Sequence, residues 1–79
     1  MPKETRPKSA RAVFAHNVRT LRKRRGLSQD AFADAAGVHR TYVGAVERCE
    51  KNITIDNIEK FAVALQVSVP EILQEATDE

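Results

Sequence analysis

Apolar residues recur along this chain at spacings of three and four residues, which is the period of an amphipathic helix. In the first such segment, Phe14, Val18 and Leu21 form one apolar stripe. Ser9 is a candidate N-cap for this segment, and Gly26 can end it in the left-handed conformation that other residues resist. The pattern therefore predicts a first helix of about four turns between these two residues.

Two shorter helices are predicted next, with a turn centred on Gly37 between them. Residues 29–36 follow Ser28, whose hydroxyl can cap free backbone amides, and their inward positions are Phe32, Ala33 and Ala36. Residues 40–48 follow His39, which either caps this helix or leaves the capping to water, and their core positions are Val43 and Val46. Because alanines let two helices cross closely, this pair has the layout of a helix-turn-helix.

The last third of the chain predicts two more helices and completes an all-α, five-helix bundle. Thr54 can cap residues 55–65, whose apolar stripe consists of Ile55, Ile58, Phe61, Ala62 and Leu65. A capping box from Ser68 to Glu71, with Pro70 in the first turn, opens the fifth helix, whose apolar face continues with Ile72 and Leu73. No segment has the alternating pattern of a strand.

Residues 40–48 carry the candidate recognition side chains. Four-residue steps place Arg40, Gly44 and Arg48 on one outer face, with Thr41 beside it. An arginine can grip guanine O6 and N7 with two hydrogen bonds, and a threonine methyl can touch a thymine methyl. Gly44 indicates either close approach to a DNA groove or close packing between helices. Tyr42 either contacts a sugar or phosphate or packs across the helix-turn-helix. This segment predicts a sequence-specific DNA-binding protein.

Neighbouring side chains have predicted supporting roles. The amide of Gln29, at the outer end of residues 29–36, can bond a phosphate oxygen. Lys51 and Asn52 directly follow the predicted groove helix, where a loop would lie near the phosphates. Glu47 faces inward, so we interpret it as structural: its carboxylate either accepts hydrogen bonds from backbone amides or pairs with an arginine of the first helix.

The charges are distributed unevenly, although the formal net charge is only +2. Residues 1–25 contain nine basic groups and one acid, whereas residues 53–79 contain one basic group and six acids. This asymmetry indicates one face for an anionic partner such as double-stranded DNA and another that faces away from it. Plain solvated surface is the alternative explanation of the same charges.

The length of the chain allows a single domain, which we expect at residues 9–75. Residues 1–8 are expected to form a flexible basic tail, either a solvated end or an arm that reaches into a minor groove, and residues 76–79 a frayed end. The apolar runs are too short for a membrane span or a signal peptide, so we expect a cytoplasmic protein. The histidines and the single cysteine lack the spacing of a metal or catalytic site, so we expect no metal, no cofactor and no enzyme activity.

Between residues 12 and 74 the chain contains, in this order, the segments RKRRGLSQ, AFADAAGV, RTYVGAVE and TIDNIEKFAVALQVSVPEIL. In these segments the Ser28 and Gln29 pair, the Gly37 and Val38 pair and Glu47 have the order and spacing of the phage-repressor (Cro-type, Xre-like) helix-turn-helix family, which this chain resembles. The resemblance implies a lambda-repressor-like DNA-binding domain. Within the family, the chain is most similar to the controller proteins of restriction–modification systems, small dimeric regulators that time expression of the nuclease.

The resemblance also implies roles for individual residues. The base contacts would come from Arg40, Thr41, Tyr42 and Gly44. Gln29 would contact a phosphate, and phosphates or adjacent bases would be contacted by Arg48, Lys51 and Asn52. Two positions depart from the family pattern, because controllers commonly have serine in place of Gly44 and often have Asn or Gly in place of Cys49.

The partners implied by the resemblance are a second copy of the chain and the transcription machinery. We expect a symmetric homodimer through Val69, Ile72 and Leu73, helped by the exposed side of residues 55–65, and a pseudo-palindromic operator. Family members that activate transcription often touch RNA polymerase through acids near the second helix, here Asp30 and Asp34, which otherwise serve as solubilising charges. The alternatives are an antitoxin-type or phage-type repressor, or a protein–protein adaptor that keeps the fold without binding DNA.

Overall fold

The computed structural model describes residues 9–75, which form five helices and contain no strand. The helices are α1 (Ala10–Arg24), α2 (Gln29–Ala36), α3 (Arg40–Glu47), α4 (Ile55–Leu65) and α5 (Val69–Ile72). None of these helices is long and apolar enough to cross a membrane. The segments expected as a basic tail, 1–8, and as a frayed end, 76–79, lie outside the described residues. The all-α, five-helix prediction is confirmed.

Each helix begins at a predicted cap residue. The hydroxyls of four caps accept a hydrogen bond from a backbone N–H three residues later at 3.0 to 3.1 Å; these caps are Ser9, Ser28, Thr54 and Ser68. His39 caps α3, because its Nδ1 accepts from the backbone N–H of Thr41 at 3.2 Å. Gly37 ends α2 with a φ of 74°, in the left-handed region that favours glycine. Helix α3 ends at Glu47, with Arg48 as its C-cap.

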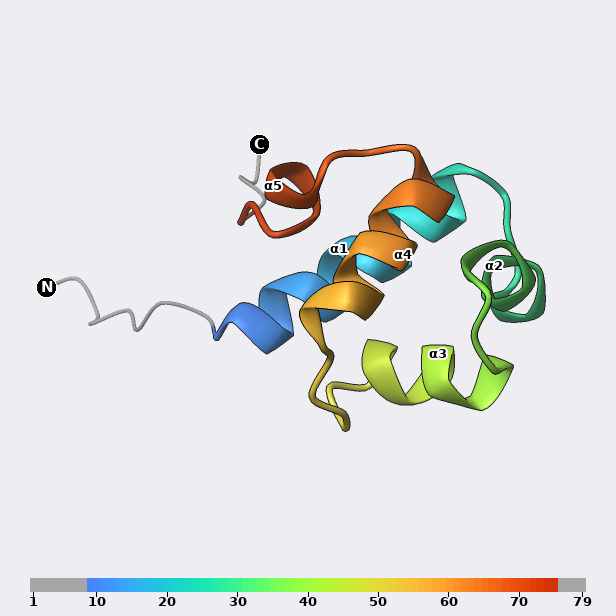
Figure 1. Cartoon of the computed structure of the whole chain (residues 1–79), viewed down its shortest axis with the longest axis horizontal. Helices are drawn as coiled ribbons and strands as arrows, with labels where there is room; N and C mark the ends of the chain where they lie inside the picture. The colour runs from blue at the N-terminus through green and yellow to red at the C-terminus, as the bar shows by residue number, and fades with distance from the viewer. Residues whose placement is uncertain (1–8, 76–79) are drawn as a thin grey trace, which may run out of the picture.

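Phe61 on α4 is the centre of the core. Its ring meets Phe32 of α2 edge to face, with centroids 5.0 Å apart, and lies 5.7 Å from the ring of Phe14 on α1. The other fully or nearly fully buried core residues include Val18, Ala33, Ala36, Val43, Val46, Ala62, Leu65 and Ile72. Helix α4 therefore crosses α1 in the middle of the molecule, with α2 and α5 packed beside it and α3 along one edge (Figure 1).

Two apolar residues lie where the sequence did not predict them. Ile55 was expected in the inward stripe of α4, but it is 75% exposed because it is the first residue of α4 and no neighbouring helix covers it. Ile72 was expected at a dimer interface, and that expectation was wrong, since its side chain is 0% exposed. Helix α5 is a single turn, and its fully buried side chain, Ile72, closes the core of its own chain, with Val69 packed against the same core and partly buried.

The end of α5 is attached to α1 by a buried amide. Asn17 is only 7% exposed, and its Nδ2 donates to the carbonyl oxygens of Ile72 at 2.8 Å and Gln74 at 2.9 Å. These carbonyls have no partner within the helix, because α5 ends there. Asn17 therefore holds the last turn of the described chain against the first helix.

Candidate nucleic-acid interface

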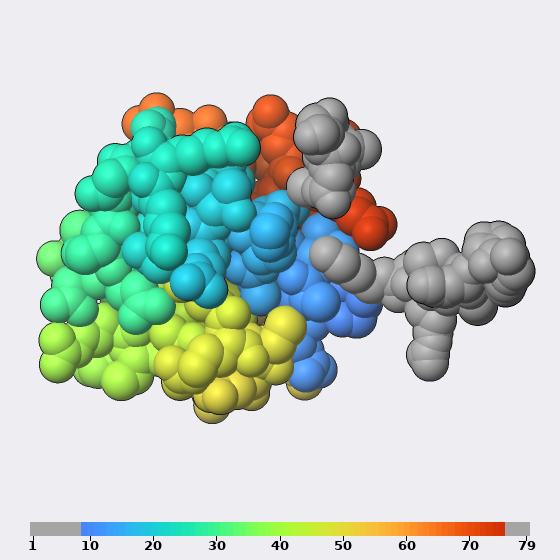
Figure 2. All heavy atoms as spheres, turned by 180° about the vertical axis from the view of Figure 1, so that it is seen from behind, coloured from blue at the N-terminus to red at the C-terminus, as the bar shows by residue number. Residues whose placement is uncertain are grey.

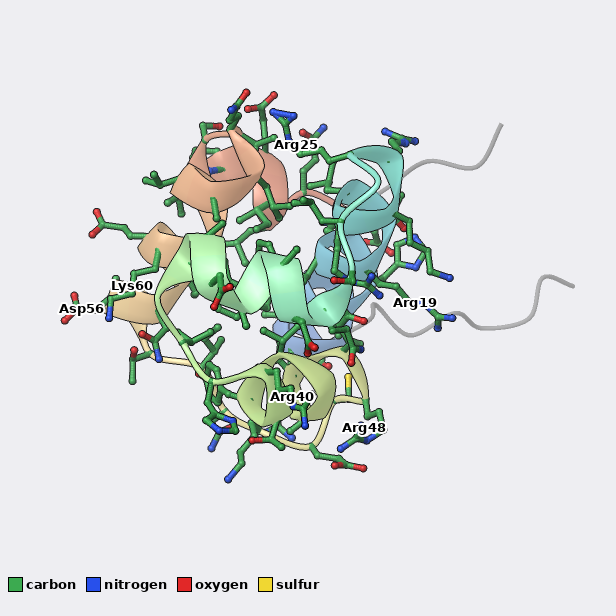
Figure 3. All side chains as sticks on the ribbon, turned by 90° about the vertical axis from the view of Figure 1, so that its right-hand side faces the viewer. Arg19, Arg25, Arg40, Arg48, Asp56 and Lys60 are labelled. Carbon is green, nitrogen blue, oxygen red and sulfur yellow. The ribbon has the colours of Figure 1, made fainter. Side chains whose placement is uncertain are left out.

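The outer face of α3 carries exposed polar side chains, while its inner face is committed to the core. Val43 and Val46 are buried against the other helices, whereas the side chains of Arg40 and Arg48 are 67% and 61% exposed. The two arginines project from α3 on the side away from the bundle (Figure 3). Thr41 is also exposed, as the sequence predicted for this outer arc.

A buried ion pair fixes α3 against α1. The Nε and Nη2 of Arg22 donate to the two carboxylate oxygens of Glu47 at 2.6 and 2.9 Å, and the side chains are only 9% and 5% exposed. The hydrogen bond from Glu47 favours the charged form and raises the pKa of Arg22 against the opposing effect of burial. Glu47 is therefore structural, as predicted, and of the two partners considered it pairs with the arginine of the first helix.

Gln29 and Thr41 are both held in place by hydrogen bonds beside this face. The Nε2 of Gln29 donates to Glu47 Oε1 at 3.0 Å, which leaves its second N–H and its Oε1 for other partners. The hydroxyl of Thr41 lies 2.7 Å from Nδ1 of His39. Because the cap residue fixes the hydroxyl, the methyl group and the remaining lone pairs of Thr41 are the parts free to meet a ligand.

Both exposed arginines of this face have an acidic partner. Nη1 of Arg40 donates a single hydrogen bond to Asp30 of α2 at 3.3 Å. Arg48 donates two hydrogen bonds to the carboxylate of Glu50. These bonds lower the pKa of the Glu50 carboxyl and raise the pKa of Arg48. Neither pair was predicted from the sequence. Glu50 lies only two residues beyond Arg48, which is not a spacing at which side chains meet along a helix.

Two predicted contact residues are less accessible than expected. Gly44 is buried beneath the side chains of Arg48 and Gln29 rather than open on the surface of α3. Tyr42 is half-buried, its ring lies edge to face on Phe61, and its hydroxyl accepts a hydrogen bond from Asn57 Nδ2 of α4 at 3.1 Å. Of the two roles considered for Tyr42, the structure shows packing, although against α4 rather than across the helix-turn-helix.

The loop after α3 is attached to the beginning of α1. The Oδ1 of Asn52 accepts from Nη2 of Arg11 at 2.5 Å, and the thiol of Cys49 lies 3.8 Å from the Arg11 carbonyl oxygen. Lys51, between them in the loop, is exposed. Figure 2 shows the loop beside α3 along one edge of the molecule, next to the first turn of α1. The loop therefore joins the end of α3 to the beginning of α1, where Arg11 contacts Asn52 although the sequence did not predict it. The phosphate contacts expected of Lys51 and Asn52 stay a prediction.

Comparison with known proteins relates this fold to a family. Residues 18–72 match a family model described as helix-turn-helix. The chain belongs to this helix-turn-helix family. It is similar to the control protein C.SmaI of Serratia marcescens, with 46% identity over 61 residues, which cover 77% of this chain and 73% of that protein.

Solved structures of the helix-turn-helix family have the same arrangement. The hypothetical transcription factor NHTF from Neisseria aligns with a TM-score of 0.83 and 43% identity, over 95% of this chain and 87% of that chain. The restriction–modification controller protein C.AhdI from Aeromonas hydrophila aligns with a TM-score of 0.76 and 40% identity, over 78% of this chain and 94% of that one. The resemblance stated from the sequence is confirmed, and so is the expected class, a DNA-binding transcriptional regulator.

Proposed function

We propose that this regulator is a restriction–modification controller that binds a pseudo-palindromic operator as a homodimer, with α3 of each copy in the major groove. The observation that carries the proposal is the outer face of α3, where Arg40, Thr41 and Arg48 are exposed on a helix whose inner side is fixed by a buried ion pair. A rigid helix with exposed arginines can present the same donors to every operator without reordering. The similarity to C.SmaI and C.AhdI supports the controller assignment.

Arg40 is the residue proposed to read a guanine. Its one hydrogen bond to Asp30 is long, at 3.3 Å, and both side chains are largely exposed. The bond therefore contributes little, and Arg40 can give it up to bind a base. A bidentate contact to guanine O6 and N7 contributes about 1–3 kcal/mol of discrimination against other bases. Gln29, Lys51 and Asn52, around the edge of this face, are proposed to contact phosphates.

The proposed dimer interface includes α5 and the outer side of α4. On α5, Leu73 remains 38% exposed at its end and Val69 is half-buried, while Val63 on α4 is 76% exposed. Val63 and Val69 line one shallow hollow of about 790 Å³ together with Val67. A second copy would cover these apolar groups, and two α3 helices in such a dimer would lie about 34–36 Å apart, one turn of DNA.

The test of the function is a footprint and a gel shift on the promoter of the protein's own gene, with a random duplex of equal length as the control. Wild-type protein is expected to protect two half-sites and to lose affinity steeply as salt increases. Arg40→Ala should weaken operator binding by about tenfold and relax the preference at one base pair, with little change on random DNA. Equal losses of affinity on both duplexes would show that Arg40 contacts a phosphate rather than a base. If the wild-type protein shows no salt-dependent DNA binding at all, the alternative of a protein–protein adaptor is favoured.

Sedimentation tests the interface separately. Val63→Lys should shift the protein to monomer, whereas Arg19→Ala, at an exposed position of α1 that does not line the hollow, should leave the dimer intact. Neighbouring genes discriminate the remaining alternatives: a nuclease or methyltransferase gene supports a controller, and a toxin gene supports an antitoxin. A contact between RNA polymerase and Asp34, which is exposed on α2, stays a prediction.

A further inference from the structure

The guanidinium of Arg48 has one edge occupied and one edge free. An arginine can form two parallel hydrogen bonds through its side edge, Nε and Nη2, or through its end edge, Nη1 and Nη2. Glu50 occupies the side edge of Arg48, with Nε to Oε2 and Nη2 to Oε1 both at 3.1 Å. Among residues 9–75, Nη1 has no hydrogen-bond partner, so the end edge remains available to a ligand.

Gly44 allows this guanidinium to lie against α3. A Cβ at position 44 would be 3.1 Å from Nη1 of Arg48 and 4.0 Å from its Cζ, so any side chain there would push the group away. With glycine present, Arg48 lines a polar hollow of about 340 Å³ together with Gln29, Arg40 and Thr41. Arg48 therefore belongs to the same face of the molecule as Arg40, one of the proposed recognition residues (Figure 3).

The carboxylate of Glu50 determines which ligand suits this edge. A phosphate oxygen brought to the free edge would carry its negative charge close to the negative charge of Glu50, and like charges at such distances repel. The O6 and N7 of guanine are neutral acceptors, so they avoid most of this repulsion while they take the same two hydrogen bonds. A paired arginine of this kind is consequently a weak phosphate anchor and a well-oriented reader of a base.

We propose that Arg48 reads a guanine in the operator, and that Glu50 is the positioning residue that holds its guanidinium end-on to the base and discourages phosphate contact. The proposal rests on the proposed function, in which α3 enters the major groove. The family resemblance implied that Arg48 contacts either a phosphate or an adjacent base, and this proposal assigns it to the base.

Arg48→Ala tests which group Arg48 contacts. Operator affinity should fall by about tenfold and the preference at one base pair should disappear, while affinity for random DNA and the slope of log affinity against log salt stay close to wild type. Lys51→Ala is the comparison for a phosphate contact, with equal losses on both duplexes and a slope reduced by about one. If Arg48→Ala behaves like Lys51→Ala, Arg48 anchors a phosphate and the proposal is overturned.

Glu50→Gln tests the positioning role, because it removes the charge with little change of shape. The preference at the same base pair should weaken, random-DNA affinity should rise, and the salt slope should steepen by about one as the freed Arg48 takes a phosphate. Glu75→Gln removes an equal charge from an exposed position after α5 and should leave the base preference unchanged. An unchanged base preference in Glu50→Gln would overturn the proposal.

Two further measurements separate the possible causes of failure. Thermal melting of both variants should match wild type, because Arg48 and Glu50 are largely exposed; a purely structural role would instead lower the melting temperature and leave the base preference intact. If wild-type protein gives no footprint and no salt-dependent shift, the proposed function fails and this proposal fails with it. If the wild-type footprint is present and only the Arg48 and Glu50 results disagree, this proposal alone is overturned.

Discussion

The guanidinium of Arg22 and the carboxylate of Glu47 form a two-point ion pair that joins the end of α1 to the end of α3. The remaining end of Arg22 donates to the Leu27 carbonyl oxygen at 2.9 Å, and Gln29 donates to Glu47, so this small network also joins the beginning of α2. A buried network in which each polar group has a partner restricts the orientation of the helices it connects. The direction in which α3 presents Arg40 and Arg48 therefore depends on a buried contact at the end of the helix.

Removing one member of this pair should be more harmful than removing both. Glu47→Ala leaves the Arg22 charge buried without its partner, so we expect a loss of about 3–5 kcal/mol in the free energy of unfolding, measured by urea denaturation. The double variant Arg22→Met with Glu47→Leu should be considerably more stable than Glu47→Ala, because no charge remains buried. If the loss of unfolding free energy in the double variant equals the sum of the losses in the two single variants, the two side chains act independently.

Asn17 should be needed for the docking of α5. Asn17→Ala leaves the carbonyls of Ile72 and Gln74 without their buried donor, which should cost about 1–3 kcal/mol of unfolding free energy. Arg19→Ala, at an exposed position of the same helix, is the matched control and should change stability little. Urea denaturation of both variants measures the difference, and equal stabilities would refute the role assigned to Asn17.

Gly44→Ala should separate stability from specificity. Alanine favours a helix by about 0.5–1 kcal/mol over glycine, and the one close contact of the new methyl group, at 3.1 Å, is with the far end of the Arg48 side chain, which can shift. We therefore expect a higher melting temperature together with weaker preference at the base pair assigned to Arg48. Gly26→Ala is the opposite control, because Gly26 has a φ of 71° and alanine should destabilise the protein there. A less stable Gly44→Ala variant would show that Arg48 cannot move aside.

The capping box of α5 should make stability depend on pH. Glu71 accepts a hydrogen bond from the backbone N–H of Ser68, and this bond lowers the pKa of its carboxyl below the ordinary value of 4.5. Because the folded pKa is the lower one, this contribution is complete above the ordinary value and is lost as pH falls through the folded value. The melting temperatures of wild type and Glu71→Ala should thus differ at neutral pH and converge under acid conditions. Glu75→Ala serves as the control, and a gap that does not change with pH would contradict the assignment.

The sequence by itself determined the helices and their order. Caps such as Ser9, Thr54 and the pair of Ser68 and Glu71 act on backbone groups within three residues, so their effect can be predicted from neighbours along the chain. The apolar period likewise identified nearly all of the core, and the exposed arginines of α3 followed from their spacing. The same local order supported the family resemblance.

Only the tertiary structure decided which groups meet across helices. The sequence left two partners open for Glu47, two explanations for Gly44 and two positions for Tyr42, and it assigned Ile55 to the core and Ile72 to an interface. The outcomes for Ile55 and Ile72 depend on where a helix begins or ends: α5 is one turn long and buries Ile72, while Ile55, the first residue of α4, stays exposed. The link between Arg48 and Glu50 depends in turn on how the chain leaves α3. Periodicity gives the direction of a side chain from its own helix, but its partner is set by packing between segments far apart in sequence.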